Sequence, residues 1–395
     1  MYPFNATPGS RPAAAVFGTL GDESGVDSRH GQFLLGFDLS GVAATNRGPD
    51  RYLVKRVSLS LVVSRDRAYP LDPTEDPMAS YLDPMDAGSI PDEDPGRPVE
   101  LFGVAYRNGF SASEFKEDSP FGPSDAGLRN AFAAGFGGKG RLVDVGNSVG
   151  KSSETFPQFD ARPFALGQVE GWPSGEPVPA GSVMTFDLNL EDPWVLGYVR
   201  EALNAGQLRG MVTSLHESGF GGAPTFAEFY TQDSVVGVPP SLEIEGTVIR
   251  ELDTDGDGLP DDWEHFHLGG LESSGGDDDD SDGVSNLDEY RLGTRPDEAG
   301  DTGALSVARA RDNGGIRIGF RHHANRAYRI EETRDGVVWK EAVAGTLEHR
   351  IREGRVVWEE APGVEDPKPV VGTEGRARLF RVASWWDGEE MSDAR

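Results

Sequence analysis

The chain is organised around two acidic stretches, Asp253-Thr-Asp-Gly-Asp-Gly-Leu-Pro-Asp-Asp-Trp-Glu264 and Asp278-Asp-Asp-Ser-Asp-Gly-Val-Ser-Asn-Leu-Asp-Glu289. Both match the pattern D-x-D-x-D-G-x5-E in full, and the two matches begin 25 residues apart. This spacing is typical of loops that surround calcium, a hard cation that takes about six to eight oxygen ligands. The sequence therefore predicts two calcium-binding loops and about two bound calcium ions.

The pattern assigns a ligand role to each loop position. Three carboxylates come first, then a backbone carbonyl, a residue that acts directly or through water, and a final glutamate that closes the shell with both oxygens. Gly258 and Gly283 stand where the backbone turns most sharply and a side chain is penalised. The predicted ligands of the first loop are Asp253, Asp255, Asp257, the carbonyl of Leu259, Asp261 and Glu264. Those of the second loop are Asp278, Asp280, Asp282, the carbonyl of Val284, Asn286 and Glu289.

A solvated acidic linker is the alternative interpretation, because runs of like charge are usually solvated. Residues 253–289 contain 14 aspartates and glutamates and no lysine or arginine, in a chain whose formal net charge is −30. Without counterions such a segment would repel itself and stay extended. Two complete motifs favour the calcium-binding interpretation.

The flanks of the loops lack the helix on each side that an EF-hand requires. Residues 247–250 read as the end of a strand, and Gly275-Gly276 precedes the second loop. A short helical segment is predicted after each loop, at 263–268 and at 287–292, and each ends at a glycine.

The loop sequences also depart from the EF-hand at position eight, where Pro260 and Ser285 replace the usual apolar residue. The phrasing D-x-D-x-D-G-L-x-D-x-x-E resembles the thrombospondin type 3 repeat, in its cysteine-free bacterial form, over about residues 251 to 297. The resemblance implies an extracellular, calcium-wrapped connector between two larger domains.

Residues 1–250 read as an all-β domain with one short helix. Leu59 and Leu61 belong to an alternation of apolar residues with serines over 57–64, which is the period of a half-buried strand. Clusters of glycine, proline and aspartate punctuate the domain as in sandwiches and jelly rolls, and the proline- and aspartate-rich stretch 69–98 reads as a long surface loop. Further strands are predicted at 32–40, 101–106, 183–188 and 241–249.

One helix is predicted between Asp192, a good N-cap, and Gly206, which would end it. Pro193 suits the first helical position. Its apolar stripe consists of Trp194, Val195, Tyr198, Val199, Ala202 and Leu203, and would lie across the sheet.

The order of four segments in this region resembles the DNRLRE-type β-sandwich of bacterial surface and secreted proteins. The segments are Phe37-Asp-Leu-Ser40, Val57-Ser-Leu-Ser-Leu61, the helix from Trp194 to Ala205, and Pro240-Ser-Leu-Glu-Ile244. The resemblance implies a jelly-roll-like β-sandwich over residues 1–250.

Residues 298–395 read as a second, smaller β domain. Strands are predicted at 316–321, 326–331 and 376–382, where apolar and polar residues alternate. Tyr328-Arg-Ile-Glu-Glu, Trp339 and Leu379-Phe-Arg-Val382 are similar to the small C-terminal sandwich domains that follow calcium repeats in secreted proteins of planctomycete and verrucomicrobial type. The predicted fold is therefore mainly β, with a calcium-loop connector over 251–297 between two sandwiches.

Composition favours an extracellular or cell-surface location. The absence of cysteine excludes disulfides and thiolate metal sites, and 67 acidic against 37 basic residues argue against nucleic acid as a partner. No stretch is long and apolar enough to span a membrane. The first residues lack the basic and apolar regions of a signal peptide, so a signal removed from this chain, or missed when its start was assigned, is our hypothesis.

No catalytic signature is present, and we expect a protein that is not an enzyme. The interpretation we favour is a calcium-binding structural or adhesive protein whose partner is a cell-surface protein or polysaccharide. Two alternatives stay open: a polysaccharide-binding module that uses exposed aromatics such as Trp172, Trp385 and Trp386, and part of a polysaccharide-degrading system.

Overall fold

Antiparallel strands dominate the structure, a computed structural model with 31% strand and 13% helix, and this confirms the predicted mainly β fold. The structure describes residues 11–18, 29–76, 80, 85, 88–92, 94–122, 128–137, 142–146, 161–216, 225–250, 252–301, 306–309, 316–321, 326–333, 340–341, 345–350, 355–360 and 379–386.

The chain forms two units. The first comprises 1–46, 54–191 and 201–246, and the second comprises 47–53, 192–200 and 247–395. The predicted calcium loops therefore belong to the same unit as the C-terminal strands, together with two short segments from far earlier in the chain.

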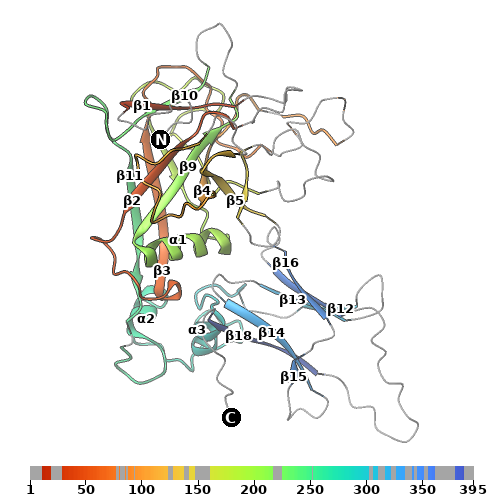
Figure 1. Cartoon of the computed structure of the whole chain (residues 1–395). Helices are drawn as coiled ribbons and strands as arrows, with labels where there is room; N and C mark the ends of the chain where they lie inside the picture. The colour runs from red at the N-terminus through yellow and green to blue at the C-terminus, as the bar shows by residue number, and fades with distance from the viewer. Residues whose placement is uncertain are drawn as a thin grey trace, which may run out of the picture. The chain divides into compact units, whose positions relative to one another are not determined.

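The first unit is built on three sheets, which Figure 1 traces from red to green. The largest contains six strands, in the order β2 (Phe33–Asp38), β9 (Gln207–Ser214), β4 (Val99–Tyr106), β5 (Ala131–Phe136) and β6 (Leu142–Asp144), with β7 (Ala165–Leu166) paired to β4. A three-stranded sheet has the order β11 (Ser241–Val248), β3 (Tyr52–Val62) and β8 (Val183–Asp187). The third pairs β1 (Ala13–Val16) with β10 (Ala227–Tyr230).

The two larger sheets share one hydrophobic core. Leu59 and Leu61 of β3 lie in the same buried cluster as Leu101 of β4 and Val212 of β9. Because residues from both sheets fill one cluster, the unit is sandwich-like, as the sequence predicts. The predicted strands at 32–40, 101–106, 183–188 and 241–249 correspond to β2, β4, β8 and β11.

The six-stranded sheet is covered on its other face as well. Phe102 and Met211 form a second buried cluster with Phe115 and Phe121, which come from the connection between β4 and β5. Successive strand residues point to opposite faces, so burial of both Leu101 and Phe102 requires cover on both sides.

Two predictions for this unit are wrong in part. Ser58 of β3 is only 4% exposed, so the serines of this strand do not mark a solvated face. The predicted surface loop at 69–98 contains no helix or extended strand among its described residues, but its first part is buried, at Tyr69, Leu71 and Asp72. This part is buried because its backbone pairs with the segment 175–178.

The predicted helix is confirmed as α1 (Pro193–Ala205). The Oδ1 atom of Asp192 accepts a hydrogen bond from the backbone N–H of Trp194 at 2.8 Å, which is the expected N-terminal cap. Gly206 follows with a φ of 75°, a left-handed conformation that ends the helix at little cost. Of the predicted apolar stripe, Val195, Val199, Ala202 and Leu203 are buried.

In the second unit, each acidic loop is followed by a short helix, α2 (Asp261–His267) or α3 (Asn286–Leu292). The predicted helical segments are thus confirmed, and no helix leads directly into either loop within the described residues 241–250 and 268–277. Leu53, Ile249, Leu259 and Trp263 form a small buried core here. Leu53 follows the 3-10 turn η1 (Pro49–Arg51), and its position is fixed by a backbone hydrogen bond of 2.7 Å from Ile249 to Arg51.

The C-terminal strands of this unit form two antiparallel sheets, drawn in blue in Figure 1. One has the order β12 (Ser306–Arg309), β13 (Ile316–Arg321), β17 (Arg355–Glu360) and β16 (Gly345–Arg350). The other has the order β15 (Lys340–Glu341), β14 (Arg326–Thr333) and β18 (Leu379–Trp386). The predicted strands at 316–321, 326–331 and 379–382 are confirmed, whereas Trp339 and residues 376–378 lie outside the described residues.

Candidate metal centres

The first acidic loop folds around the carboxylate of Asp253. Its Oδ1 atom accepts a hydrogen bond from the N–H of Gly256 at 2.7 Å, and its Oδ2 atom accepts one from Gly258 at 3.1 Å. Both glycines have positive φ, 80° and 98°, which lets the backbone turn back on itself. As a result, carboxylate oxygens of Asp253, Asp255 and Asp257 lie within 4.8 Å of one another.

Glu264, on α2, completes this loop as a buried acid without a partner. Its side chain is 0% exposed, and neither of its carboxylate oxygens has a hydrogen-bond partner. Burial, together with the negative charges of Asp257 and Asp255, raises the pKa of this carboxyl to about 7. A buried carboxylate is stable when a cation or hydrogen-bond donors compensate its charge, so this glutamate requires such a partner to ionise.

Two other predicted ligands, Leu259 and Asp261, make hydrogen bonds within the loop. The N–H of Leu259 donates to Oδ1 of Asp257 at 2.8 Å, and the Leu259 side chain is fully buried. Asp261 accepts hydrogen bonds from the N–H and hydroxyl of Thr254 at 2.7 and 2.6 Å, which lower the pKa of its carboxyl. The Asp261 side chain therefore links the end of the loop to its beginning at Thr254.

The second loop repeats this arrangement. Asp278 accepts hydrogen bonds from the N–H of Asp282 at 3.1 Å and from that of Gly283 at 2.9 Å. Carboxylate oxygens of Asp278, Asp280 and Asp282 again lie within 4.8 Å of one another. The Oδ2 atoms of Asp280 and Asp282 are buried without a hydrogen-bond partner, while the N–H of Val284 donates to Oδ1 of Asp282 at 2.8 Å.

Glu289 occupies the place in this loop that Glu264 has in the first. It is 0% exposed, its Oε2 atom has no partner, and its Oε1 atom accepts a 3.2 Å hydrogen bond from Thr294. Burial, followed by the charge of Asp280, raises its pKa to about 7. Asn286 is also buried, but its amide donates to the carbonyl of Ser274 at 3.1 Å and to Asp279 at 3.3 Å, so it supports the loop backbone.

The donor set in both loops suits a hard metal ion. All of its side-chain donors are carboxylate oxygens, three aspartates converge in each loop, and a buried glutamate with an unpartnered oxygen closes each one. Such oxygens bind calcium or magnesium rather than softer metals. The structure therefore brings together the predicted aspartate triads, and the burial of Glu264 and Glu289 fits the closing role predicted for them.

Gly275, which precedes the second loop, bridges the two loops. The N–H of Gly275 donates to Oδ2 of Asp257, and the carbonyl of Gly275 accepts a 2.9 Å hydrogen bond from Leu287. The rings of Trp263 on α2 and Tyr290 on α3 meet edge to face with their centroids 5.5 Å apart. Each of these aromatic residues is a direct neighbour of the closing glutamate of its loop, so the two loops share one packed scaffold.

Substitution of Gly275 by alanine is expected to loosen both loops. A Cβ atom at Gly275 would lie 2.9 Å from the carbonyl oxygen of Asp257 and 3.2 Å from Cβ of Leu287. Overpacking of this kind costs about 1–3 kcal/mol. Hydrogen exchange over residues 253–292 would measure the change, with Gly276→Ala as the matched control, since the nearest atom to a Cβ there is 3.8 Å away. Equal exchange in the two variants would contradict the contact.

A third group of acids lies outside the predicted loops. Carboxylate oxygens of Asp72, Asp76 and Asp94, in the first unit, are within 4.8 Å of one another. No spacing motif marks these three acids in the sequence, because 17 residues separate Asp76 from Asp94. The signal that was present is the density of aspartate in the stretch 69–98.

Of the tryptophans suggested for polysaccharide binding, the structure describes the side chain of Trp172 alone. Trp172 packs against the main core of the first unit, and its Nε1 atom donates to the carbonyl of Glu176 at 3.3 Å. Trp385 and Trp386 lie on β18, and their side chains are outside the described part of the chain. A cavity of about 610 Å³ in the first unit runs along β2 and contains none of the predicted metal ligands.

Comparisons of the chain with protein-family models, with curated proteins and with solved structures find no match. Among the described residues, no helix is both long enough and apolar enough to cross a membrane. The geometry of the acidic loops is therefore the main ground for a functional assignment.

Proposed function

We propose that the chain is a calcium-binding structural protein of the bacterial cell surface or secretome, in which about two calcium ions hold the segment 251–297 in one conformation. The thrombospondin type 3 resemblance of this segment supports the proposal, as do the oxygen ligands of both loops. Extracellular calcium, present at about millimolar concentration, would keep sites of modest affinity filled.

The observation that carries the proposal is the burial of Glu264 and Glu289. Each is 0% exposed and has at least one carboxylate oxygen without a hydrogen-bond partner, beside three converging aspartates. Acids are rarely buried in this way unless they are paired or bind a metal. One divalent cation in each loop would compensate the charge that otherwise opposes folding of this segment.

Calcium would act here through charge and geometry. Asp253, Asp255 and Asp257 would hold the first ion with Glu264, and Asp278, Asp280, Asp282 and Glu289 would hold the second. The hydrogen bonds that Asp253 and Asp278 accept from loop N–H groups already orient their carboxylates. Pre-orientation of this kind lowers the entropy that binding must overcome.

Calorimetric titration of the chelator-treated protein with calcium tests the proposal. We expect about two sites in the loops, and their loss in the Glu264→Gln, Glu289→Gln double variant, which keeps side-chain size but removes the closing charges. An absence of binding heat for both calcium and magnesium would reduce residues 251–297 to a solvated spacer.

Calcium binding is also expected to release protons near neutral pH. In the metal-free chain the pKa of Glu264 and of Glu289 is raised to about 7. The folded form then holds protons that the unfolded form has lost, so this contribution to stability is complete below about pH 4.5 and disappears as the pH rises through about 7. The metal-free segment is therefore expected to be more stable at about pH 5 than at about pH 8.

Calcium needs the ionised carboxylates, so its binding has the opposite pH dependence. Titrations at about pH 6.5 in buffers of different ionisation enthalpy would measure the released protons. Binding heats that do not depend on the buffer would show that these glutamates are already ionised without metal.

A further inference from the structure

The backbone before Asp72 is fixed by pairing within the first unit. The N–H of Leu71 donates to the carbonyl of Glu176 at 3.0 Å, and the N–H of Val178 donates to the carbonyl of Tyr69 at 3.0 Å. This pairing buries the start of the β3–β4 connection, and Asp72 itself is only 2% exposed. Its carboxylate is therefore held in place by a rigid segment.

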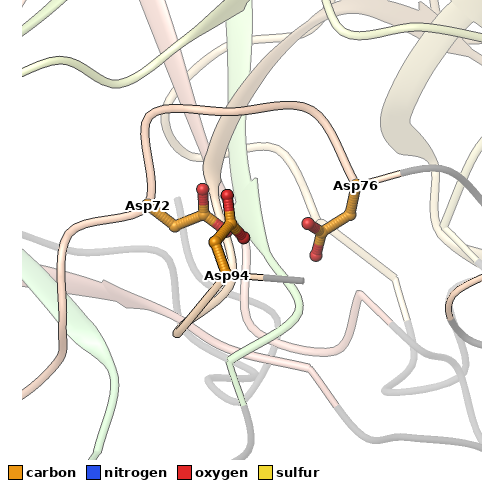
Figure 2. Close-up of side chains that lie close together, drawn as sticks. All are labelled: Asp72, Asp76 and Asp94. Carbon is orange, nitrogen blue, oxygen red and sulfur yellow. The ribbon is translucent and has the colours of Figure 1, made fainter. Parts of the chain in front are cut away.

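The end of the same connection returns against Asp72. Gly96 has a φ of 115°, and a Cβ atom there would lie 3.2 Å from Cβ of Asp72. This close approach brings Asp94 beside Asp72, and Figure 2 shows their carboxylates facing each other, with Asp76 directed toward them from the other arm of the turn. One oxygen from each of the three acids lies within 4.8 Å of the other two.

Within the described part of the chain, Arg97 is the arginine that contacts this cluster. Nη1 of Arg97 contacts Asp76 at 2.7 Å and Asp92 at 2.6 Å, so this arginine is shared between two acids. The charges that act on Asp72 are those of Asp76 and Asp94, and both are negative. The Oδ2 atom of Asp72 is buried and has no hydrogen-bond partner.

The hydroxyl of Thr74 cannot satisfy the two remaining carboxylates. It lies 2.7 Å from Oδ1 of Asp72 and 2.6 Å from Oδ2 of Asp94, yet a hydroxyl has a single hydrogen to donate. While both acids are ionised, one of these short oxygen–oxygen contacts has no hydrogen between its atoms. A cation near the three acids would relieve the repulsion that this leaves.

We infer that Asp72, Asp76 and Asp94 form a third site for a hard divalent cation, built into the sandwich-like unit and separate from the two acidic loops. The unpartnered Oδ2 atom of buried Asp72 supplies a ligand that no protein group satisfies. Calcium binds oxygens at about 2.3–2.6 Å, so ligand atoms up to about 5 Å apart can share one ion. The cation would tie the two ends of the β3–β4 connection together.

The test compares calcium binding to four forms of the full chain in about 0.15 M salt, which suppresses non-specific attraction. These forms are the unmodified chain, Asp72→Asn with Asp94→Asn, Glu264→Gln with Glu289→Gln, and all four substitutions together. We expect about three, two, one and no tight sites respectively, by native mass spectrometry and by calorimetry. Asparagine keeps the size of aspartate and removes a buried charge, so these variants are expected to fold.

The matched control is Glu75→Gln, in the same turn. Glu75 contacts Arg162 at 3.4 Å, their side chains are 42% and 66% exposed, and the Glu75 carboxylate is not part of the cluster. It is expected to leave the third site unchanged, whereas Asp72→Asn is expected to weaken binding there by at least about tenfold, the lower end of the losses seen even for groups that only support a metal ligand.

The outcomes separate this site from the loops. One calcium ion retained by the Glu264→Gln, Glu289→Gln chain and lost on Asp72→Asn supports the third site, even if the loops themselves bind nothing. Binding of magnesium in place of calcium at this position also supports a cation site. If the chain with substituted loops binds neither ion, or binds one that is insensitive to Asp72→Asn, the inference is wrong.

Discussion

Removal of calcium with a chelator is expected to open residues 253–292 while the strands of the first unit stay protected. At a free calcium concentration about 100 times the dissociation constant, each filled site stabilises the fold by about 2.7 kcal/mol. Two filled loops would thus contribute about 5 kcal/mol, which is a large part of the stability of an ordinary domain. Hydrogen exchange with and without chelator, resolved along the chain, would measure this difference.

The Glu264→Gln, Glu289→Gln variant sharpens this experiment because the sign of its effect depends on calcium. In the presence of calcium, the amides of residues 253–292 in this variant should exchange as fast as those of the unmodified chain in chelator. In chelator it should exchange more slowly than the unmodified chain, since it has lost two carboxylates whose ionisation burial opposes.

Asp288→Asn is the control, because Asp288 neighbours Glu289 but is largely exposed and faces Arg291 at 3.5 Å. The proposed function would be contradicted if amide hydrogen exchange over residues 253–292 changed neither on addition of chelator nor on substitution of the two glutamates.

Glu100→Ala is expected to be the most destabilising single substitution that we predict for the first unit. Glu100 on β4 makes a two-point ion pair with Arg29, from Nε to Oε2 at 2.7 Å and from Nη2 to Oε1 at 2.8 Å. The two side chains are 3% and 7% exposed, and Thr213 adds a 2.9 Å hydrogen bond to Oε2. Loss of the acid breaks this two-point ion pair at a buried guanidinium, which costs about 3–5 kcal/mol.

This loss of unfolding free energy would be measured by denaturant titration, with amide hydrogen exchange of β4 and β9 as the readout. Glu245→Ala is the matched control: it removes a 3.0 Å ion pair with Lys55, but both side chains are more than half exposed, so the expected cost is about 0–1 kcal/mol. The double variant Arg29→Met, Glu100→Leu should recover part of the loss, because a buried pair replaced by apolar residues is often neutral. Similar effects of Glu100→Ala and Glu245→Ala would show that the buried pair contributes little.

Features set by neighbouring residues were predictable from the sequence. The bounds of α1 follow from Asp192 and Gly206, whose cap and left-handed conformation act within one turn. The aspartate triads of the two loops follow in the same way from a spacing that places alternate side chains toward one centre. The physical cause in each case is local, so the composition of a short window is sufficient.

Features that depend on distant pairing were not predictable. Burial of Ser58 requires cover on the second face of β3, which no pattern within that strand reveals. The core beneath the acidic loops includes Leu53, because the backbone at Ile249 pairs with Arg51, 198 residues earlier. The cluster around Asp72 likewise depends on pairing with Glu176 and Val178, far along the chain.

The contact between Trp263 and Tyr290 gives the acidic segment an optical signal of its own. Trp263 directly precedes Glu264, and Tyr290 directly follows Glu289, so an indole and a phenol lie beside the two candidate ion positions. A luminescent lanthanide that replaces calcium in either loop would be excited through these rings. Emission sensitised in this way would report the filling of the acidic segment, and Trp263→Phe would remove most of it without removing a ligand.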